Sequence, residues 1–135
     1  MPYWVYMLFV GNKKHGSNRK IYTGYTKNLS IRLTQHLGVN SVKGARLTRN
    51  QPIELAYLES FNSRAKAMQR ERQLKHEAPF NQKREKLKLI NDFKKTSHEY
   101  LICINNMIEE YYSFLGRLIE CFSRNEDIIK RSLNE

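Results

Sequence analysis

The sequence has few cysteines and, over most of its length, few acidic residues. Its two cysteines, Cys103 and Cys121, match neither a CxxC motif nor the spacing of a metal site. A disulfide scaffold needs a denser set, so we expect reduced thiols in a cytoplasmic protein. The N-terminal apolar run at 3–10 is too short to cross a membrane and lacks the flanks of a signal peptide. Internal repeats and low-complexity segments are also absent from the sequence.

Acidic residues are scarce in the first two-thirds of the chain. Residues 1–96 contain 20 Lys and Arg against 6 Asp and Glu, a net charge of +14, whereas residues 97–135 have 4 against 7, or −3. Such a basic segment favours an anionic partner, with nucleic acid ahead of an acidic membrane surface or an acidic protein. With 135 residues, 40% of them hydrophobic, the chain can form a folded domain with an appendage. We therefore predict a basic domain over 1–96 and an acidic tail over 97–135.

The hydrophobic pattern of the basic segment predicts an α+β fold with a three-stranded antiparallel sheet flanked by helices. Three strands are expected, at residues 3–10, 21–26 and 53–61. The first is apolar throughout, which is typical of a strand buried on both faces, and a polar loop at 11–20 joins it to the second. Three helices are expected, at residues 28–37, 63–76 and 81–93, with Asn28 capping the first and Asn62 or Ser63 the second. The polar segment 39–51 predicts a surface loop.

The tail has apolar residues at alternating spacings of three and four. They are Leu101, Ile104, Ile108, Tyr111, Leu115, Leu118 and Phe122. This pattern predicts one long amphipathic helix of about three heptads. Its apolar stripe must be buried, so the tail dimerises, packs on its own domain or docks a partner protein. Residues 100–122 are the predicted surface for a homodimer or such a partner.

Glu71 lies on the apolar side of its predicted helix. Ala67 and Met68 precede it by one turn and Leu74 follows it by one turn. Burying a lone carboxylate costs on the order of several kcal/mol, so a cation or hydrogen-bond donors must meet it. Glu71 therefore pairs with a nearby arginine, lies at a rim or binds a metal ion. A single carboxylate suits Mg²⁺, which keeps several waters and takes phosphate oxygens as further ligands.

Arg32 and His36 project from one side of the first predicted helix, because they are one turn apart. Arginine suits a phosphate, since its guanidinium donates two hydrogen bonds and stays charged, but a solvated basic helix face would look the same. Tyr6 and Tyr22 are equally typical of ordinary sheet aromatics. A phenol serves as a base at neutral pH only where positive charge stabilises the phenolate. Gly24, inside a strand, indicates close approach of another backbone or a ligand.

The order and spacing of these residues resemble the GIY-YIG nuclease family. The resemblance rests on Val5-Tyr6, Tyr22-Thr23-Gly24, Arg32 with His36, and Glu71. It extends over residues 2 to 93 and is strongest for the small stand-alone bacterial members, which are similar to the N-terminal nuclease of the excision-repair endonuclease. The fold that it implies, a three-stranded antiparallel sheet with flanking helices, agrees with the expectation from the hydrophobic pattern.

The resemblance also implies a role for each matching residue. Tyr6 or Tyr22 helps to deprotonate the attacking water. Arg32 stabilises charge on the scissile phosphate, and His36 assists proton transfer or orients a tyrosine. Glu71 holds one divalent metal ion, Mg²⁺ or Mn²⁺.

The chain departs from the family pattern at a few positions. Trp4 replaces the glycine of the first motif and Thr23 the isoleucine of the second, both at packing positions where we expect activity to survive. Some members also use an asparagine beyond the glutamate, for which Asn81 is a candidate counterpart. The tail from about residue 97 has no counterpart in the family core.

Together these features predict a metal-dependent endonuclease that hydrolyses single- or double-stranded DNA in repair or processing, without a membrane partner. Backbone phosphates are expected to contact basic residues in two loops and one helix. These are Lys13, Lys14, Arg19, Lys20, Lys43, Arg46, Arg49, Lys83, Arg84, Lys86 and Lys88. Two alternatives stay open: a non-catalytic nucleic-acid-binding module, and an interaction protein that works through its C-terminal helix. The sequence does not separate DNA from RNA.

Overall fold

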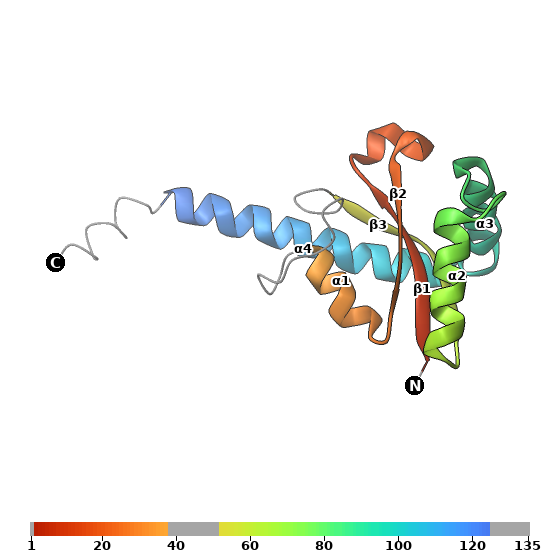
Figure 1. The fold of residues 1–135 in the computed structure, drawn as a ribbon. Helices are drawn as coiled ribbons and strands as arrows, with labels where there is room; N and C mark the ends of the chain where they lie inside the picture. The colour runs from red at the N-terminus through yellow and green to blue at the C-terminus, as the bar shows by residue number, and fades with distance from the viewer. Residues whose placement is uncertain (1, 38–51, 125–135) are drawn as a thin grey trace.

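A computed structural model describes residues 2–37 and 52–124, and its centre is a three-stranded antiparallel sheet (Figure 1). The strands are β1 (Tyr3–Val10), β2 (Lys20–Thr26) and β3 (Ile53–Phe61), in the order β2-β1-β3. The predicted α+β fold is confirmed, and only β2 differs in its start, by one residue. β1 is the middle strand, and its residues 5–8 are fully buried, as expected for a strand covered on both faces.

Four α-helices accompany the sheet in the described residues, and one short helix lies in the first loop. They are η1 (Lys13–Asn18, a 3₁₀ helix), α1 (Leu29–Leu37), α2 (Arg64–His76), α3 (Lys83–Thr96) and α4 (His98–Arg124). The predicted caps are present: the Asn28 side chain accepts the Ile31 N–H at 3.1 Å, and Ser63 accepts the Lys66 N–H at 3.2 Å. The expected loop 39–51 lies outside the described residues.

The helices cover the two faces of the sheet separately. On one face, Tyr6 and Leu8 of β1 pack with Leu33 of α1 and with Leu101 and Ile108 of α4. The opposite face packs against α2 through Ala67 and Leu74, and against α3 through Ile90. Figure 1 shows α2 and α3 on the other side of the sheet from α1. The face that carries Tyr6 is therefore the one covered by α1 and α4.

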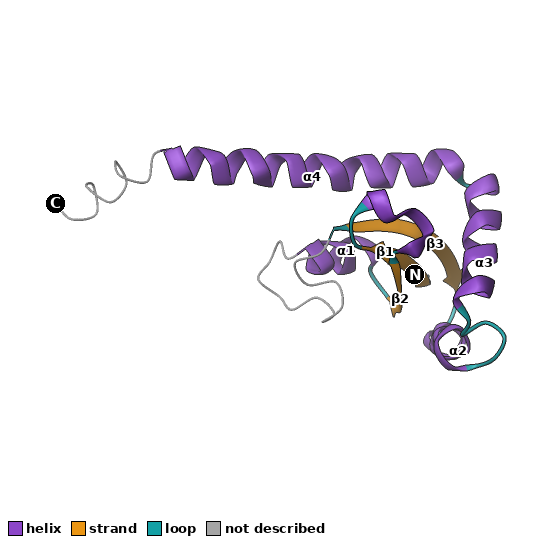
Figure 2. Cartoon of the chain, turned by 90° about the horizontal axis from the view of Figure 1, so that it is seen from above, coloured by secondary structure: helices purple, strands orange, loops and turns teal. Residues whose placement is uncertain are grey.

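Helix α4 lies along β3, which is an edge strand, and satisfies backbone groups that the sheet leaves unpaired. The Leu55 N–H donates to the Asn105 side-chain oxygen at 2.7 Å, and the Asn105 amide nitrogen donates to the Leu55 carbonyl at 3.0 Å. The Tyr112 hydroxyl accepts the Ile53 N–H at 3.2 Å. The first part of the tail thus packs on its own domain, while Figure 2 shows that the rest of α4 extends beyond the sheet. The domain boundary at 96/97 and the homodimer stay predictions.

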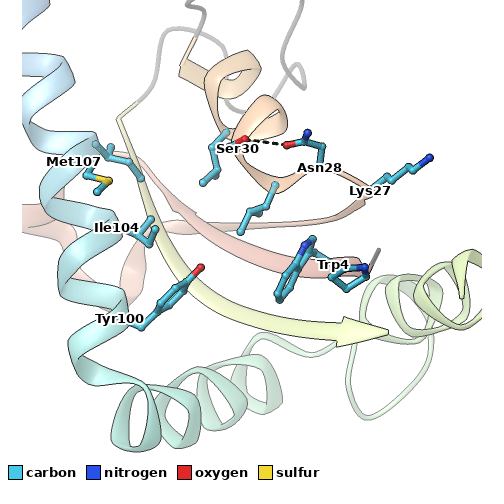
Figure 3. Close-up of a pocket in the computed structure, with 11 residues that line it drawn as sticks. Trp4, Lys27, Asn28, Ser30, Tyr100, Ile104 and Met107 are labelled. Carbon is cyan, nitrogen blue, oxygen red and sulfur yellow. Dashed lines mark hydrogen bonds between the residues drawn. The ribbon is translucent and has the colours of Figure 1, made fainter. Parts of the chain in front are cut away.

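An apolar pocket of about 540 Å³ lies between α1, α4 and the start of β1. Trp4 lies on one side of it and Ile104 and Met107 on the other, with Lys27 at its margin (Figure 3). None of the predicted catalytic residues lines this pocket. Within the described part of the chain, no helix is both long enough and apolar enough to cross a membrane.

We expect Asn105→Ala to destabilise the protein. The substitution removes both hydrogen bonds to Leu55 and leaves a part-buried N–H and carbonyl without them, which costs about 1–3 kcal/mol. Urea unfolding followed by circular dichroism measures the loss. Asn106→Ala is the matched control, because Asn106 is exposed on the same helix and the change in helix propensity is the same. Equal free energies of unfolding for the two variants would contradict the role of Asn105.

Candidate active site

Four of the predicted catalytic residues meet on the face of the sheet that α1 covers. Tyr6 pairs with Gly24, and the next pair on this face places Tyr22 beside Tyr6, with 6.1 Å between ring centroids. Helix α1 brings His36 against both rings, at centroid distances of 5.7 Å from Tyr6 and 4.9 Å from Tyr22. Arg32 lies one turn earlier on α1 and points to the phenol of Tyr6. Its spacing from His36 predicted that the two side chains would project from the same side of the helix.

Two groups of α1 contact the Tyr6 hydroxyl. It is 2.8 Å from His36 Nε2, and Arg32 Nε donates to it at 3.4 Å. A guanidinium can only donate, so the phenol oxygen accepts from Arg32, whereas the direction of the bond to His36 depends on the imidazole tautomer. We assign His36 Nε2 as the acceptor, which makes the histidine the group that can take a proton from Tyr6.

The environment keeps the phenol and the imidazole neutral at neutral pH. Burial and the neighbouring Tyr22 raise the pKa of Tyr6 well above its usual range, although Arg32 works in the opposite direction. Burial and the charge of Arg32 lower the pKa of His36 to about 4. Burial lowers the pKa of Arg32, but Tyr22 and Tyr6 outweigh it and raise that pKa overall. The guanidinium is therefore the fixed positive charge of this cluster.

Position 24 requires glycine, because the Tyr6 phenol occupies the space that a side chain would need. A Cβ built at Gly24 would lie 2.6 Å from the Tyr6 hydroxyl oxygen and 2.8 Å from Cζ of the same ring. The close approach expected here from the sequence is real, but a side chain makes it, not another backbone or a ligand. A larger residue at this position must displace Tyr6 from His36 and Arg32.

Glu71 of α2 lies near the same cluster and is held by a lysine. Its side chain is 20% exposed, and Lys75 Nζ is 3.4 Å from its Oε1. The same ammonium lies 5.8 Å from the Tyr22 ring centroid and so connects Glu71 with the tyrosines. Among the residues that the structure describes, the ion-pair partner of Glu71 is thus a lysine one turn later. Sequence reasoning missed Lys75, although the i, i+4 spacing of Glu and Lys was the available signal.

The donor set at this cluster suits a metal ion that needs few protein ligands. No three His, Cys, Asp or Glu side chains come together as a metal site anywhere in 2–37 or 52–124. Glu71 is the carboxylate that the structure links to Tyr22, and it keeps some exposure. A single carboxylate fits Mg²⁺ or Mn²⁺ when waters and substrate oxygens supply the remaining ligands. It does not fit Zn²⁺, which takes three or four protein ligands.

The predicted phosphate-binding residues differ in their exposure and in the contacts that they make within the protein. Lys14, Lys20 and Arg84 are exposed, and so is Lys13, which is ion-paired with Glu109. Lys43, Arg46 and Arg49 lie outside the described residues. Lys86 is half-buried, and both burial and the charge of Lys75 lower its pKa, whereas Lys88 is exposed and paired with Glu85.

Arg19 is predicted to contact phosphate because of its position in a basic loop, but the structure shows a mostly buried side chain there. Its side chain is only 8% exposed, and Nη1 is 3.1 Å from the Glu54 carboxylate. The guanidinium also lies 4.5 Å from the centroid of the Phe9 ring. Lys83 is tied to the same place, because its Nζ donates to the Arg19 carbonyl at 2.7 Å. Both residues fasten the hairpin to its surroundings.

Comparison with known proteins gives matches over the same part of the chain. The model of the GIY-YIG catalytic domain matches residues 2–86. A UPF0213 protein of Staphylococcus haemolyticus is 38% identical over 76 residues, which are 56% of this chain and 84% of that protein. A UPF0213 protein of Oceanobacillus iheyensis is 42% identical over 74 residues, or 54% of this chain and 78% of that protein. This chain is also similar to a UPF0213 protein of Bacillus halodurans that was solved by solution NMR, with 27% sequence identity. The match covers 67% of this chain and 84% of that protein, with a TM-score of 0.38.

We expect Gly24→Ala to destabilise the protein through Tyr6. The added methyl group overlaps the phenol, and overpacking of this kind costs about 1–3 kcal/mol. A double-mutant cycle with Tyr6→Phe measures the coupling by urea unfolding. Because Tyr6→Phe removes the nearest clashing atom, Gly24→Ala should cost less in that background. Additive effects would show that the methyl group meets something other than the Tyr6 hydroxyl.

Lowering the pH should destabilise the protein through His36. The folded state keeps this ring neutral down to about pH 4, whereas in the unfolded chain it protonates near its ordinary pKa of 6.5. The unfolded state therefore binds more protons between these values, and the free energy of unfolding falls as the pH drops through this window. Urea unfolding from pH 7 to 4 measures the slope, and His36→Gln should flatten it. An unchanged slope in that variant would refute a depressed His36 pKa.

Proposed function

Because the chain belongs to the GIY-YIG catalytic-domain family, we propose that it is a metal-dependent endonuclease that hydrolyses phosphodiester bonds, with DNA as the expected substrate. The family match confirms the resemblance seen in the sequence. The observation that carries the proposal is the convergence of Tyr6, Tyr22, Arg32 and His36 beside Glu71. These groups come from β1, β2, α1 and α2, and phosphodiester hydrolysis needs what each one offers.

The cluster offers a fixed positive charge for the phosphate. Arg32 is already cationic and held in place, since it donates to Tyr6 and its Nη1 donates to Gln35 at 2.9 Å. A guanidinium positioned in advance stabilises the charge that grows on the phosphate oxygens in the transition state. Lys75 adds a second cation near Tyr22. The surface lysines supply non-specific contacts with the nucleic-acid backbone, so binding is expected to weaken with salt.

The cluster also offers a route for the proton of the attacking water. Tyr22 is only partly buried, whereas Tyr6 is fully buried and its proton is already directed to His36. Arg32 orients the phenol of Tyr6. This phenol can accept a proton while the neutral imidazole of His36 accepts the phenolic proton of Tyr6. Glu71 would hold Mg²⁺ or Mn²⁺, and the ion when bound supplies Lewis-acid polarisation of the phosphate and a more acidic water. Positions on the protein thus exist for each role that the family implies.

A cleavage assay tests the proposal. The full chain should cut labelled nucleic acid in the presence of Mg²⁺ or Mn²⁺, across a panel of single-stranded, duplex and branched DNA and RNA. Chelator or Glu71→Gln should abolish cutting, and Arg32→Ala should slow it by about 100-fold or more. Glu85→Gln is the matched control, because Glu85 also pairs with a lysine on its own helix, and that lysine, Lys88, is not one of the cluster residues.

Two results would contradict the proposal. Cutting that persists in Glu71→Gln or in excess chelator would show that the metal mechanism is wrong. Binding to every member of the panel without any cutting would identify the chain as a non-catalytic nucleic-acid-binding module. Preparing each variant by the same procedure guards against a contaminating nuclease, since such an activity would not depend on Glu71.

A further inference from the structure

Lys75 pairs with the carboxylate that is proposed to hold the metal ion. Its ammonium is 3.4 Å from Glu71 Oε1 and 5.8 Å from the Tyr22 ring centroid, and the side chain is 35% exposed. It therefore neutralises the carboxylate of Glu71 at the edge of the tyrosine cluster.

The charges around Glu71 make it a poor site for a divalent cation on its own. Arg32 contacts Tyr6, Lys75 contacts Tyr22, and Glu71 pairs with Lys75. Lys86 of α3 is a further cation, and both burial and the charge of Lys75 lower its pKa. The cations outnumber the carboxylate, so a free metal ion meets net repulsion. A phosphate group would reverse this balance, since it brings the negative charge that the cluster lacks.

We propose that Lys75 is a phosphate-binding residue that leaves Glu71 for a phosphate of the nucleic acid, so that metal ion and nucleic acid bind with positive coupling. This inference rests on the proposed function. In the free protein the ammonium neutralises Glu71. When nucleic acid arrives, the ammonium pairs with phosphate, and Glu71 becomes available as a metal ligand.

The side chain of Lys75 is suited to such an exchange. Lysine carries a compact ammonium on a long stem with several rotatable bonds, so the charge can move by a few ångströms without movement of the helix. The face of Tyr22 attracts a cation as it moves, because the ring lies within cation–π distance. Its i, i+4 pair with Glu71 is partly exposed, and pairs of this kind contribute little to stability, so separation is cheap.

Coupling of this kind is reciprocal and can be measured from either side. If phosphate increases the affinity for the metal ion, the metal ion must increase the affinity for phosphate by the same factor. Thymidine 3′,5′-bisphosphate is a suitable probe, because it presents two phosphates of a DNA backbone but contains no phosphodiester to cleave. Mn²⁺ can be followed by calorimetry and by electron paramagnetic resonance, neither of which depends on catalytic activity.

The experiment compares Mn²⁺ binding by the full chain with and without the bisphosphate, in four proteins. In the wild type, the bisphosphate should raise the Mn²⁺ affinity by about 5- to 100-fold, the usual range of coupling between sites. Lys75→Met should bind Mn²⁺ more tightly than the wild type when no phosphate is present, and should lose most of the coupling. Lys75→Arg should restore the coupling in part. Lys66→Met removes an equal charge from an exposed lysine of the same helix, and should behave as the wild type.

The outcomes separate this inference from the proposed function. If Glu71→Gln abolishes Mn²⁺ binding but Lys75→Met changes neither the affinity nor the coupling, the metal site stands and the exchange is overturned. If Glu71→Gln leaves Mn²⁺ binding intact, both the metal site and the exchange are overturned. A loss of coupling in Lys66→Met equal to that in Lys75→Met would also overturn the inference, because a general effect of charge would then explain it.

Discussion

The hydroxyl of Tyr6 belongs to the fully buried central part of β1, residues 5–8, and a polar group in that position must find its partners inside the protein. Much of the arrangement around it follows from this requirement. The strand opposite has to carry Gly24, because no side chain fits beside the phenol. Helix α1 has to place His36 and Arg32 against the hydroxyl, one to accept and one to donate. Tyr6 therefore belongs both to the hydrophobic core and to the candidate site, and a substitution that alters one also alters the other.

The elements of the fold and most of the candidate site could be predicted from the sequence, because both depend on local signals. Strand alternation, the caps at Asn28 and Ser63, and helical spacing place each side chain on a known face. What could not be predicted depends on contacts between distant segments. Arg19 looked like part of a basic loop, and only the position of Glu54, 35 residues later, shows that it is buried. Lys75 was not singled out in the sequence, because its contact with Tyr22 depends on how α2 packs beside β2.

The electrostatic character of the site differs from that of a preformed metal centre. A closed metal centre gathers several carboxylates or histidines, which repel one another until the ion arrives. Here one carboxylate lies among cations, and the histidine is held neutral by burial and by Arg32. The free site is thus prepared for an anion. Under the proposed function, a phosphate of the substrate would complete the metal coordination, and discrimination between substrates would begin before any bond is broken.

Helix α4 belongs to the segment that lies beyond the matched family domain, yet it covers the outer edge of β3. An uncovered edge strand is a template to which a strand of another molecule can add, and such additions lead to aggregation. The Asn105 amide resembles a short piece of β-strand, because it offers one donor and one acceptor to the backbone of Leu55. In this chain α4 therefore occupies backbone groups of β3 that a strand of another molecule could otherwise pair with. Release of the helix would expose these groups and permit self-association through the sheet.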